Sequence, residues 1–326
     1  MGRWAKKAKK ATIKDEIYDS LTSKFNAGKG RDHNADKATK DDRNVIYTER
    51  SYRNYMSSGK LFVNWIKKNH PECKNLKNCR QYVDEWIGYM TEKGYSPFTI
   101  ASRRSAMVKI YGAESNEFIS GPPRFRKNIK NNRDVHEKAR NRHISEETEK
   151  RLGRIVSAIG CRRQEFQRIH GTDVFYLSKE DLKKMEYEYE ADFKKNHPDK
   201  TYVPFYTSFE PGWYVKLKGK GGKVRYTQIL GENDNETIDI VNELQAYGSN
   251  LVMPKVHNAF PEHYYRSEYA KRYYNKYKRD VDTLTIRQLY YCRKDKKGIV
   301  YDRRSMLMTS RMMGHNRIDV IAGHYL

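Results

Sequence analysis

The chain has 326 residues, enough for two ordinary domains with hydrophobic cores. Its 65 lysine and arginine residues outnumber 41 aspartate and glutamate residues, which gives a formal net charge of +24. A surplus of this size favours a polyanionic partner, and nucleic acid is the commonest large one. The sequence has no signal peptide, no lipidation motif and no apolar run of roughly 18 residues, which argues against membrane binding and predicts a cytoplasmic protein.

The first part of the chain, residues 1–44, is polar and basic and lacks apolar periodicity. It is too hydrophilic to fold alone, so we expect a flexible basic arm, which in the presence of DNA would gain order. Residues 45–119 instead repeat apolar side chains at helical spacing, as Tyr82, Trp86 and Met90 illustrate. This pattern predicts a compact DNA-binding bundle of about four helices.

A basic segment that begins with glycine and proline follows at residues 120–142 and shows no periodicity. Such a composition predicts an extended linker between two domains. Basic side chains of the bundle and of the linker are candidate DNA contacts: Arg103, Arg104, Lys109, Arg124, Arg126 and Lys127.

Residues 143–326 predict a second domain that is mostly helical with a small antiparallel sheet or hairpin. Ser145 is a candidate N-cap for its first helix. Apolar and polar residues alternate over 213–218, a glycine pair supplies a turn, and residues 224–230 return as a second strand. From about Thr237 onward the pattern is helical again. The expected fold class is therefore mainly α (α+β).

The four cysteines, Cys73, Cys79, Cys161 and Cys292, are scattered and form no C-x-x-C pair. Zinc sites need closer ligand spacing with histidines to match. We therefore expect reduced, partly buried thiols, no metal and no cofactor.

Four short motifs follow one another in the second domain: GCRRQE (160–165), KGKGGKVR (218–225), TLTIRQLYY (283–291) and MMGHNRIDVIAGHY (312–325). In this order, behind the helical N-terminal module, they resemble the tyrosine recombinase (phage integrase) family over roughly residues 45 to 325. The resemblance implies a site-specific recombinase or integrase of a phage or mobile element. Such a protein acts on double-stranded DNA as a tetramer and cleaves and rejoins it through a 3′-phosphotyrosyl intermediate.

The residue types suit this chemistry. A tyrosine oxygen can attack phosphorus and leave later, guanidinium groups stabilise the charged transition state, and a lysine or histidine can protonate the leaving 5′ oxygen. The resemblance implies the following roles: Tyr325 as nucleophile, Arg162, Arg287 and His315 as phosphate ligands, Lys220 as general acid, and Glu165 as the carboxylate that orients Arg162.

Several of these assignments have rivals in the sequence. Arg163 competes with Arg162, and Arg293 offers another register for Arg287. Two further lysines, which are also candidate DNA contacts, compete with Lys220: Lys218 and Lys223.

The sequence departs from the family pattern at three points. The family has H-x-x-R at its second arginine, whereas Leu284 stands three residues before Arg287. Tyr325 follows His315 by ten residues, where nine are usual, and only Leu326 follows the tyrosine. These departures favour an alternative function, a catalytically inactive or weakened DNA-binding regulator on the same fold. A hydrolytic nuclease would need a cluster of carboxylates and metal ions, and none stands out.

Overall fold

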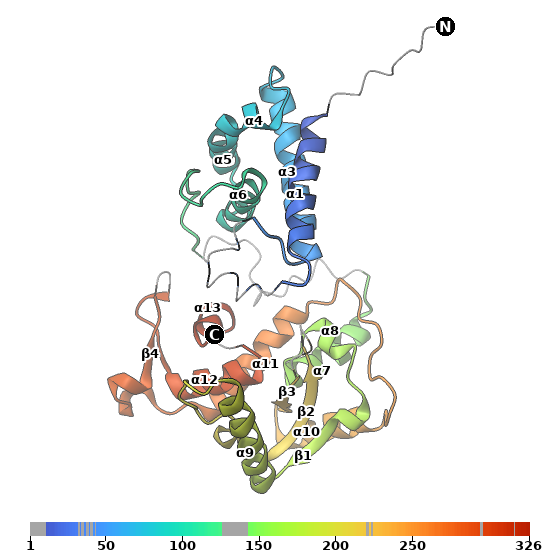
Figure 1. Ribbon diagram of the computed structural model, residues 1–326. Helices are drawn as coiled ribbons and strands as arrows, with labels where there is room; N and C mark the ends of the chain where they lie inside the picture. The colour runs from blue at the N-terminus through green and yellow to red at the C-terminus, as the bar shows by residue number, and fades with distance from the viewer. Residues whose placement is uncertain are drawn as a thin grey trace. The chain divides into compact units, whose positions relative to one another are not determined.

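The computed structural model describes residues 11–31, 33, 36, 39, 42, 44–125, 143–219, 222, 224–293, 296–315 and 317–326. The chain forms two compact units, Met1–Ile129 and Lys130–Leu326 (Figure 1). Helices predominate in both units, and the two small antiparallel sheets among the described residues belong to the second. The predicted mainly α (α+β) class is confirmed.

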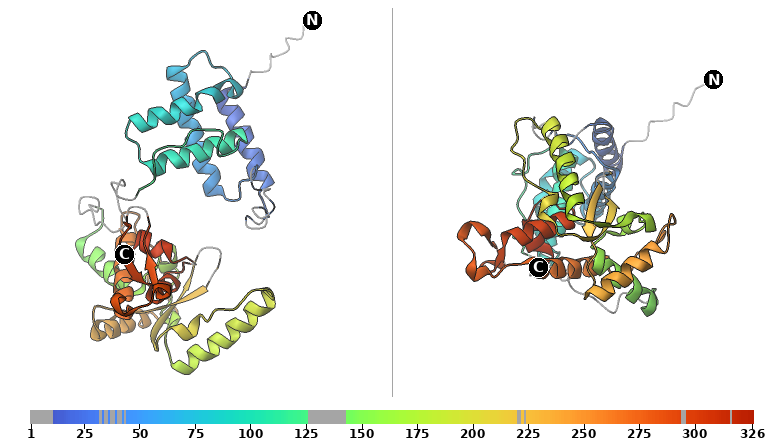
Figure 2. Two further views of the ribbon diagram at one scale, coloured as in Figure 1. Left: turned by 90° about the vertical axis from the view of Figure 1, so that its left-hand side faces the viewer. Right: turned by 90° about the horizontal axis from the view of Figure 1, so that it is seen from below.

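The first unit is a helical bundle. Its elements are α1 (Ile13–Ala27), α3 (Glu49–Asn69), α4 (Leu76–Cys79), η1 (Arg80–Tyr82), α5 (Val83–Glu92) and α6 (Pro97–Tyr111). The helices α1 and α3 lie side by side, and both pack against α6 (Figure 2). Phe62, Trp86 and Met90 are buried in the common core, which agrees with the helical bundle that the sequence predicts.

Helix α1 corrects the expectation of a flexible arm over residues 1–44. Thr12 caps the helix by accepting the N–H of Asp15, and the Asp15 carboxylate accepts the N–H of Thr12 in return. Three apolar side chains at four-residue spacing are buried in the core of the bundle: Ile13, Ile17 and Leu21. The residues around these three positions are mostly charged or polar. The average composition of residues 1–44 therefore does not reveal the short apolar stripe. Residues 1–10 of the predicted arm lie outside the described ranges.

The second unit contains seven helices among its described residues. They are α7 (Glu146–Ile159), α8 (Arg163–Phe166), α9 (Lys179–Asn196), α10 (Asp234–Gln245), α11 (Glu262–Tyr277), α12 (Arg303–Met312) and α13 (Asp319–His324). Short 3-10 turns stand between them: η4 (Gly171–Asp173), η5 (Tyr206–Ser208), η7 (Val281–Thr283) and η8 (Ile286–Gln288). Ser145 caps α7, as predicted, by accepting the N–H of Thr148 at 3.2 Å.

The larger sheet has the order β1-β2-β3, with β1 (Val174–Leu177), β2 (Gly212–Lys218) and β3 (Val224–Gln228) antiparallel. The predicted hairpin is confirmed, with Lys218 opposite Val224. The strands β4 (Leu289–Tyr291) and β5 (Val300–Asp302) form a second hairpin that projects from the unit (Figure 2).

This second hairpin corrects the expectation of helical structure from about Thr237 onward. Its strands have the sequences LYY and VYD, and aromatic and β-branched residues of this kind favour extended backbone. Gly298, at φ +97°, lies in the connection between them, where a helix would be interrupted.

Helix α11 is the central helix of the second unit. It packs against α7 and α12, and α13 packs against α12 (Figure 1). Its buried face carries Arg266, Tyr269 and Tyr273, all without solvent exposure. Gly160 ends α7 at φ +56°, and a Cβ there would lie 2.3 Å from Cδ1 of Tyr269. Glycine at this position therefore allows α7 to end directly against α11.

The described residues include no helix long and apolar enough to cross a membrane. The four cysteines are buried and carry free thiols, as the sequence predicts. Within the described ranges, no group of three or more His, Cys, Asp or Glu side chains is arranged to hold a metal ion.

Candidate active site

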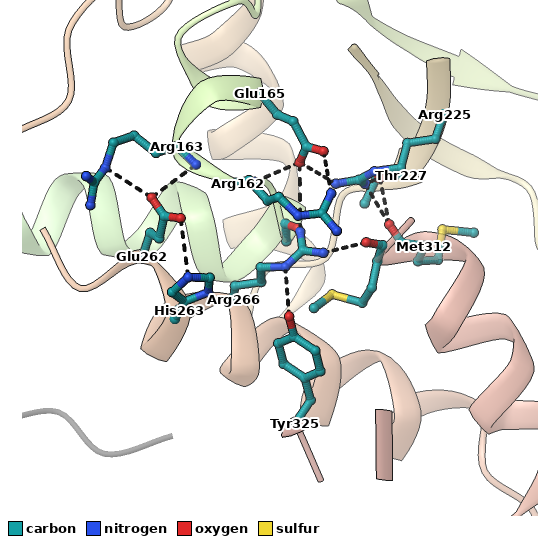
Figure 3. Close-up of polar contacts among 12 residues, drawn as sticks. Arg162, Arg163, Glu165, Arg225, Thr227, Glu262, His263, Arg266, Met312 and Tyr325 are labelled. Atoms are coloured by element: carbon teal, nitrogen blue, oxygen red, sulfur yellow. Dashed lines mark hydrogen bonds and ion pairs between the residues drawn. The ribbon is translucent and has the colours of Figure 1, made fainter. Parts of the chain in front are cut away.

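A buried carboxylate, that of Glu165 at 2% exposure, lies at the centre of a charged cluster in the second unit (Figure 3). The backbone N–H of Arg162 donates to its Oε2 at 2.7 Å, and Nη1 of Arg162 donates to Oε1 at 2.8 Å. Arg225 donates from Nη2 to Oε2 at 2.6 Å, and Nη1 of Arg266 lies 3.9 Å from the same oxygen. One carboxylate therefore faces three guanidinium groups.

The electrostatics of the cluster keep Glu165 and Arg225 charged at neutral pH. Burial by itself raises the pKa of Glu165, but Arg225 and Arg266 outweigh it and hold that pKa at about 2. Burial lowers the pKa of Arg225 to about 10, and Glu165 opposes this shift. Three cations against one anion leave a surplus of two positive charges. Such a surplus attracts an anion, and guanidinium groups match the paired oxygens of a phosphate.

Arg266 connects the cluster to the tyrosine at the end of the chain. It lies on α11 with no solvent exposure and donates from Nη1 to the backbone oxygen of Gly160 and from Nη2 to that of Met313. Its Nε donates to the hydroxyl of Tyr325 at 3.4 Å, and its guanidinium carbon lies 5.9 Å from the centre of the tyrosine ring. Tyr325 itself is only 3% exposed. The hydroxyl thus lies inside the positive cluster.

His315 lies in the turn that follows α12. Its ring centroid is 5.6 Å from that of Tyr325, and its backbone N–H donates to the oxygen of Ser310 at 2.8 Å. Burial, followed by the charges of Arg266 and Arg162, lowers the pKa of His315 to about 3. The imidazole is therefore neutral near pH 7. Its Nε2 is buried and has no hydrogen-bond partner among the described residues, so it can bond to a ligand.

The backbone around Tyr325 is held by the segment between β4 and β5. Nζ of Lys296 donates to the backbone oxygen of Ala322 at 2.9 Å and to that of Leu326. Tyr325 donates its own N–H to the oxygen of Ile321 at 2.9 Å. These bonds fix α13 and the residues after it, and with them the tyrosine side chain.

Four of the six expected catalytic residues come together in this cluster: Arg162, Glu165, His315 and Tyr325. Arg163, the rival of Arg162, points elsewhere. Its guanidinium donates to Asn258 and to the backbone oxygen of Phe260, and it pairs with Glu262 at 3.1 Å. Of the two arginines, Arg162 is therefore the one that contacts Glu165.

The structure does not bring Arg287 to the cluster. Arg287 lies exposed in η8, and within the described ranges no hydrogen bond or ion pair joins it to Glu165, His315 or Tyr325. The sequence predicts helix from about Thr237 onward, but Arg287 lies in a 3-10 turn that is followed directly by β4, so no buried helical face directs this arginine inward. Arg293, its rival, is also exposed.

Arg266, which the sequence motifs did not select, is the arginine that lies beside both Glu165 and Tyr325. The residue three positions before it is His263, exposed at the same end of α11, with Nε2 3.8 Å from Glu262. The sequence His263-Tyr264-Tyr265-Arg266 therefore contains the H-x-x-R pattern that Leu284 and Arg287 lack. A search for that pattern along the whole chain would have found it.

Arg225 is a second residue that sequence reasoning missed. It belongs to the motif KGKGGKVR. The sequence feature that could have identified it is its position on the second strand of the predicted hairpin. Lys218 is exposed at the end of β2. Four other expected residues lie outside the described ranges: Arg126, Lys127, Lys220 and Lys223.

The candidate DNA contacts of the bundle take part in contacts within the first unit. Arg103 lies over the ring of Tyr95 at 4.7 Å, and Arg104 donates to the backbone oxygen of Phe118 at 2.8 Å. Lys109 donates to the backbone oxygen of Asp42 at 2.8 Å, and burial lowers its pKa. Arg124 is exposed. A role of these residues in DNA binding stays a prediction.

Two solved structures of a recombinase bound to DNA are similar to this chain. One is the XerH site-specific recombinase with a palindromic difH substrate in a post-cleavage complex, with a TM-score of 0.46 and 14% identity, covering 94% of this chain and 89% of that chain. The other is XerH with its difH substrate in a pre-cleavage complex, with a TM-score of 0.43 and 13% identity, covering 96% and 91%. No protein-family model matches the chain, and no curated protein matches it at a significant level.

Proposed function

We propose that the chain is a DNA strand transferase of the tyrosine recombinase type. It would cleave and rejoin double-stranded DNA at specific sites through a 3′-phosphotyrosyl intermediate, in the service of a phage or another mobile element. The observation that carries this proposal is the hydroxyl of Tyr325, 3.4 Å from Nε of Arg266 inside a buried cluster with surplus positive charge. A tyrosine oxygen next to guanidinium donors is what attack on a phosphodiester requires.

In the proposed reaction the hydroxyl of Tyr325 loses its proton to solvent water, and its oxygen forms a bond to phosphorus while the bond from phosphorus to the 5′ oxygen breaks. The N–H of Arg266 at the hydroxyl favours the phenolate as it forms. Arg162 and Arg266 would donate to the nonbridging oxygens, and Nε2 of His315 would add a third donor. Lys220 would give the departing 5′ oxygen its proton.

His263 supports the same assignment for the second arginine. Residues three apart on a helix share a face, so His263 and Arg266 lie on neighbouring turns of α11. His263 is exposed whereas Arg266 is buried. We assign His263 to the outer edge of the phosphate site, where it would contact the DNA backbone.

Two groups of the proposed phosphate site are buried in this structure. Arg266 has no solvent exposure and Tyr325 has 3%. We propose that α13 and the residues that follow it shift when DNA binds, so that a phosphate can reach both groups. We propose that this shift occurs when the protein assembles as a tetramer on paired DNA sites. The proposed location of the protein is the cytoplasm.

A covalent-trapping experiment tests the proposal. A binding site is first selected from random duplexes by repeated cycles of binding, and a nick is then placed near the cleavage position so that the cut strand diffuses away. Wild-type protein is expected to form an SDS-resistant adduct with this DNA, and Tyr325→Phe to bind equally tightly without forming it. Tight binding by wild type with no adduct would overturn the recombinase proposal in favour of a DNA-binding regulator. Salt-sensitive binding is expected in either case and decides nothing.

The same assay decides between the two candidates for the second arginine. Arg266→Gln is expected to reduce the rate of adduct formation by roughly 100-fold or more, the usual effect of removing one transition-state donor. Arg287→Gln, the matched control, should leave the rate within about threefold of wild type. The opposite pattern would return the role to Arg287.

A further inference from the structure

Arg225 bridges three elements of the second unit. It lies on β3 with 7% exposure, and Nη2 donates to Glu165, a residue of α8, at 2.6 Å. Nη1 donates to Oγ1 of Thr227 at 2.6 Å and to the backbone oxygen of Met312, the last residue of α12, at 2.7 Å. The hydroxyl of Thr227 donates to the same oxygen at 3.0 Å. The end of α12 is therefore bound to β3 by two side chains.

The turn after Met312 is shaped by Arg225. Gly314 has φ +66°, and a Cβ at this position would lie 2.7 Å from both Cδ and Nε of Arg225. Nε of Arg225 is buried and has no hydrogen-bond partner among the described residues, because Gly314 lies against it. His315 follows directly. Cδ and the guanidinium group of Arg225 therefore pack against the turn that carries His315.

Only arginine can make this set of contacts. Its planar group presents five donors in a fixed fork, whereas lysine presents one nitrogen. A buried cation without partners is costly, and here each terminal nitrogen of Arg225 has an oxygen partner. These donors are aimed at the protein itself, at Glu165, Thr227 and Met312.

We propose that Arg225 is a positioning residue, which couples the β2–β3 hairpin to the turn that carries His315 and so sets the imidazole beside Tyr325. The hairpin is also the part of the sequence that carries Lys220. A change in the hairpin on DNA binding would be transmitted through Arg225 to Glu165 and to His315. The catalytic consequence rests on the function proposed above, whereas the positioning itself does not.

Two substitutions test the coupling. Arg225→Lys keeps the charge but cannot reach Glu165 and Met312 at once. Arg225→Met removes the charge as well. Arg272→Met is the matched control, because Arg272 also clamps two backbone oxygens of this unit, those of Ser157 and Leu230, outside the cluster.

Both Arg225 variants are expected to form the covalent adduct about 100-fold more slowly, the cost of misplacing a catalytic group by about 1 Å. Their affinity for DNA should stay within about threefold of wild type. In the control Arg272→Met, both the rate of adduct formation and the affinity for DNA should stay within about threefold of wild type. Adduct formation by Arg225→Lys at the wild-type rate would overturn the proposal, and so would an equal loss in Arg272→Met.

A second readout needs no DNA cleavage. In protein with labelled histidine, the NMR signal of His315, assigned with His315→Gln, reports the pKa of this side chain. Burial is the largest cause that lowers this pKa to about 3, so in Arg225→Lys, which keeps the charge, an imidazole displaced from its buried place should show a higher pKa. The backbone N–H of His315 should also exchange faster with solvent. An unchanged pKa and exchange rate would overturn the positioning role.

The readouts separate failure of this inference from failure of the proposed function. If wild-type protein forms no adduct, the recombinase proposal fails, and the titration and exchange of His315 still decide the role of Arg225. If the Arg225 variants do not fold, Thr227→Val supplies the test. It removes one of the two donors to Met312 and retains Arg225, so the same changes are expected at smaller size. Wild-type behaviour of Thr227→Val in that case would refute the coupling.

Discussion

Replacement of Glu165 by glutamine is predicted to destabilise the second unit strongly. Glutamine has the shape of glutamate but no charge, and the site holds three guanidinium groups around one carboxylate. Loss of that carboxylate leaves buried cations without a counter-charge. The expected consequence is partial unfolding of the cluster at a lower temperature or denaturant concentration than in wild type.

The magnitude follows from two routes. Removal of one partner from a buried ion pair costs roughly 3 to 5 kcal/mol. The pKa of Glu165 lies at about 2 instead of 4.5, and at about 1.4 kcal/mol for each pH unit this difference amounts to about 3 kcal/mol. For a unit of this size, such a loss lowers the melting temperature by roughly 6 to 20 °C.

The pH dependence has a definite sign. The folded state holds the Glu165 carboxyl at a lower pKa than the unfolded state does, so the unfolded state binds the proton more tightly. The stabilisation is therefore complete above pH 4.5 and is lost as the pH falls toward 2. The difference in unfolding free energy between wild type and Glu165→Gln should be largest at pH 7 and should shrink steadily below pH 4.5.

The measurement is unfolding in urea, monitored by hydrogen exchange of peptides from residues 212–230. These peptides belong to the second unit, so its unfolding is observed separately from that of the first. Glu268→Gln is the control, because Glu268 forms an exposed pair with Lys271 and its loss should cost less than about 1 kcal/mol. Equal stability of Glu165→Gln and wild type at pH 7 would refute the reasoning. A difference that does not change between pH 7 and pH 3 would refute the electrostatic cause.

Two further predictions concern packing. Leu21→Ala should destabilise the first unit by roughly 2 to 5 kcal/mol, because this side chain of α1 is fully buried; a loss below 0.5 kcal/mol in thermal unfolding would mean that α1 does not contribute to the core. Gly314→Ala should cost at least about 2 kcal/mol, since it adds a Cβ 2.7 Å from Arg225 at a positive φ. Gly248→Ala, also at positive φ but with open space around it, should cost about half as much in the same urea titration, and equal costs would contradict the contact with Arg225.

Short sequence motifs predicted the residues of the site whose positions depend on the backbone within a few residues of them. Arg162 and Glu165 are three residues apart, and the structure joins them through both a backbone and a side-chain hydrogen bond at the start of α8. His315 follows Gly314, which has a positive φ. A glycine at this position indicates a turn, and that indication is visible in the sequence. Short-range geometry of this kind can be read from spacing alone.

The two missed arginines depend on long-range packing. Arg266 enters the cluster because the face of α11 that carries it is buried between α7 and α12, and Arg225 enters because β3 runs beside the end of α12. Neither fact follows from residue spacing. Arg287 lies in a motif that resembled a helix, yet the residues after it pair with β5 and leave it exposed.

The sequence by itself determined the charge of the protein, its mainly helical class, the β2–β3 hairpin and the order of the motifs, since composition, apolar period and turn residues act locally. Only the tertiary structure decided which arginines share the carboxylate of Glu165, that α1 joins the core of the first unit, and that Tyr325 is buried against Arg266. The physical reason is that a buried charge is stable only where partners from distant segments converge on it. That convergence is set by the packing of helices and strands, and no single stretch of sequence specifies it.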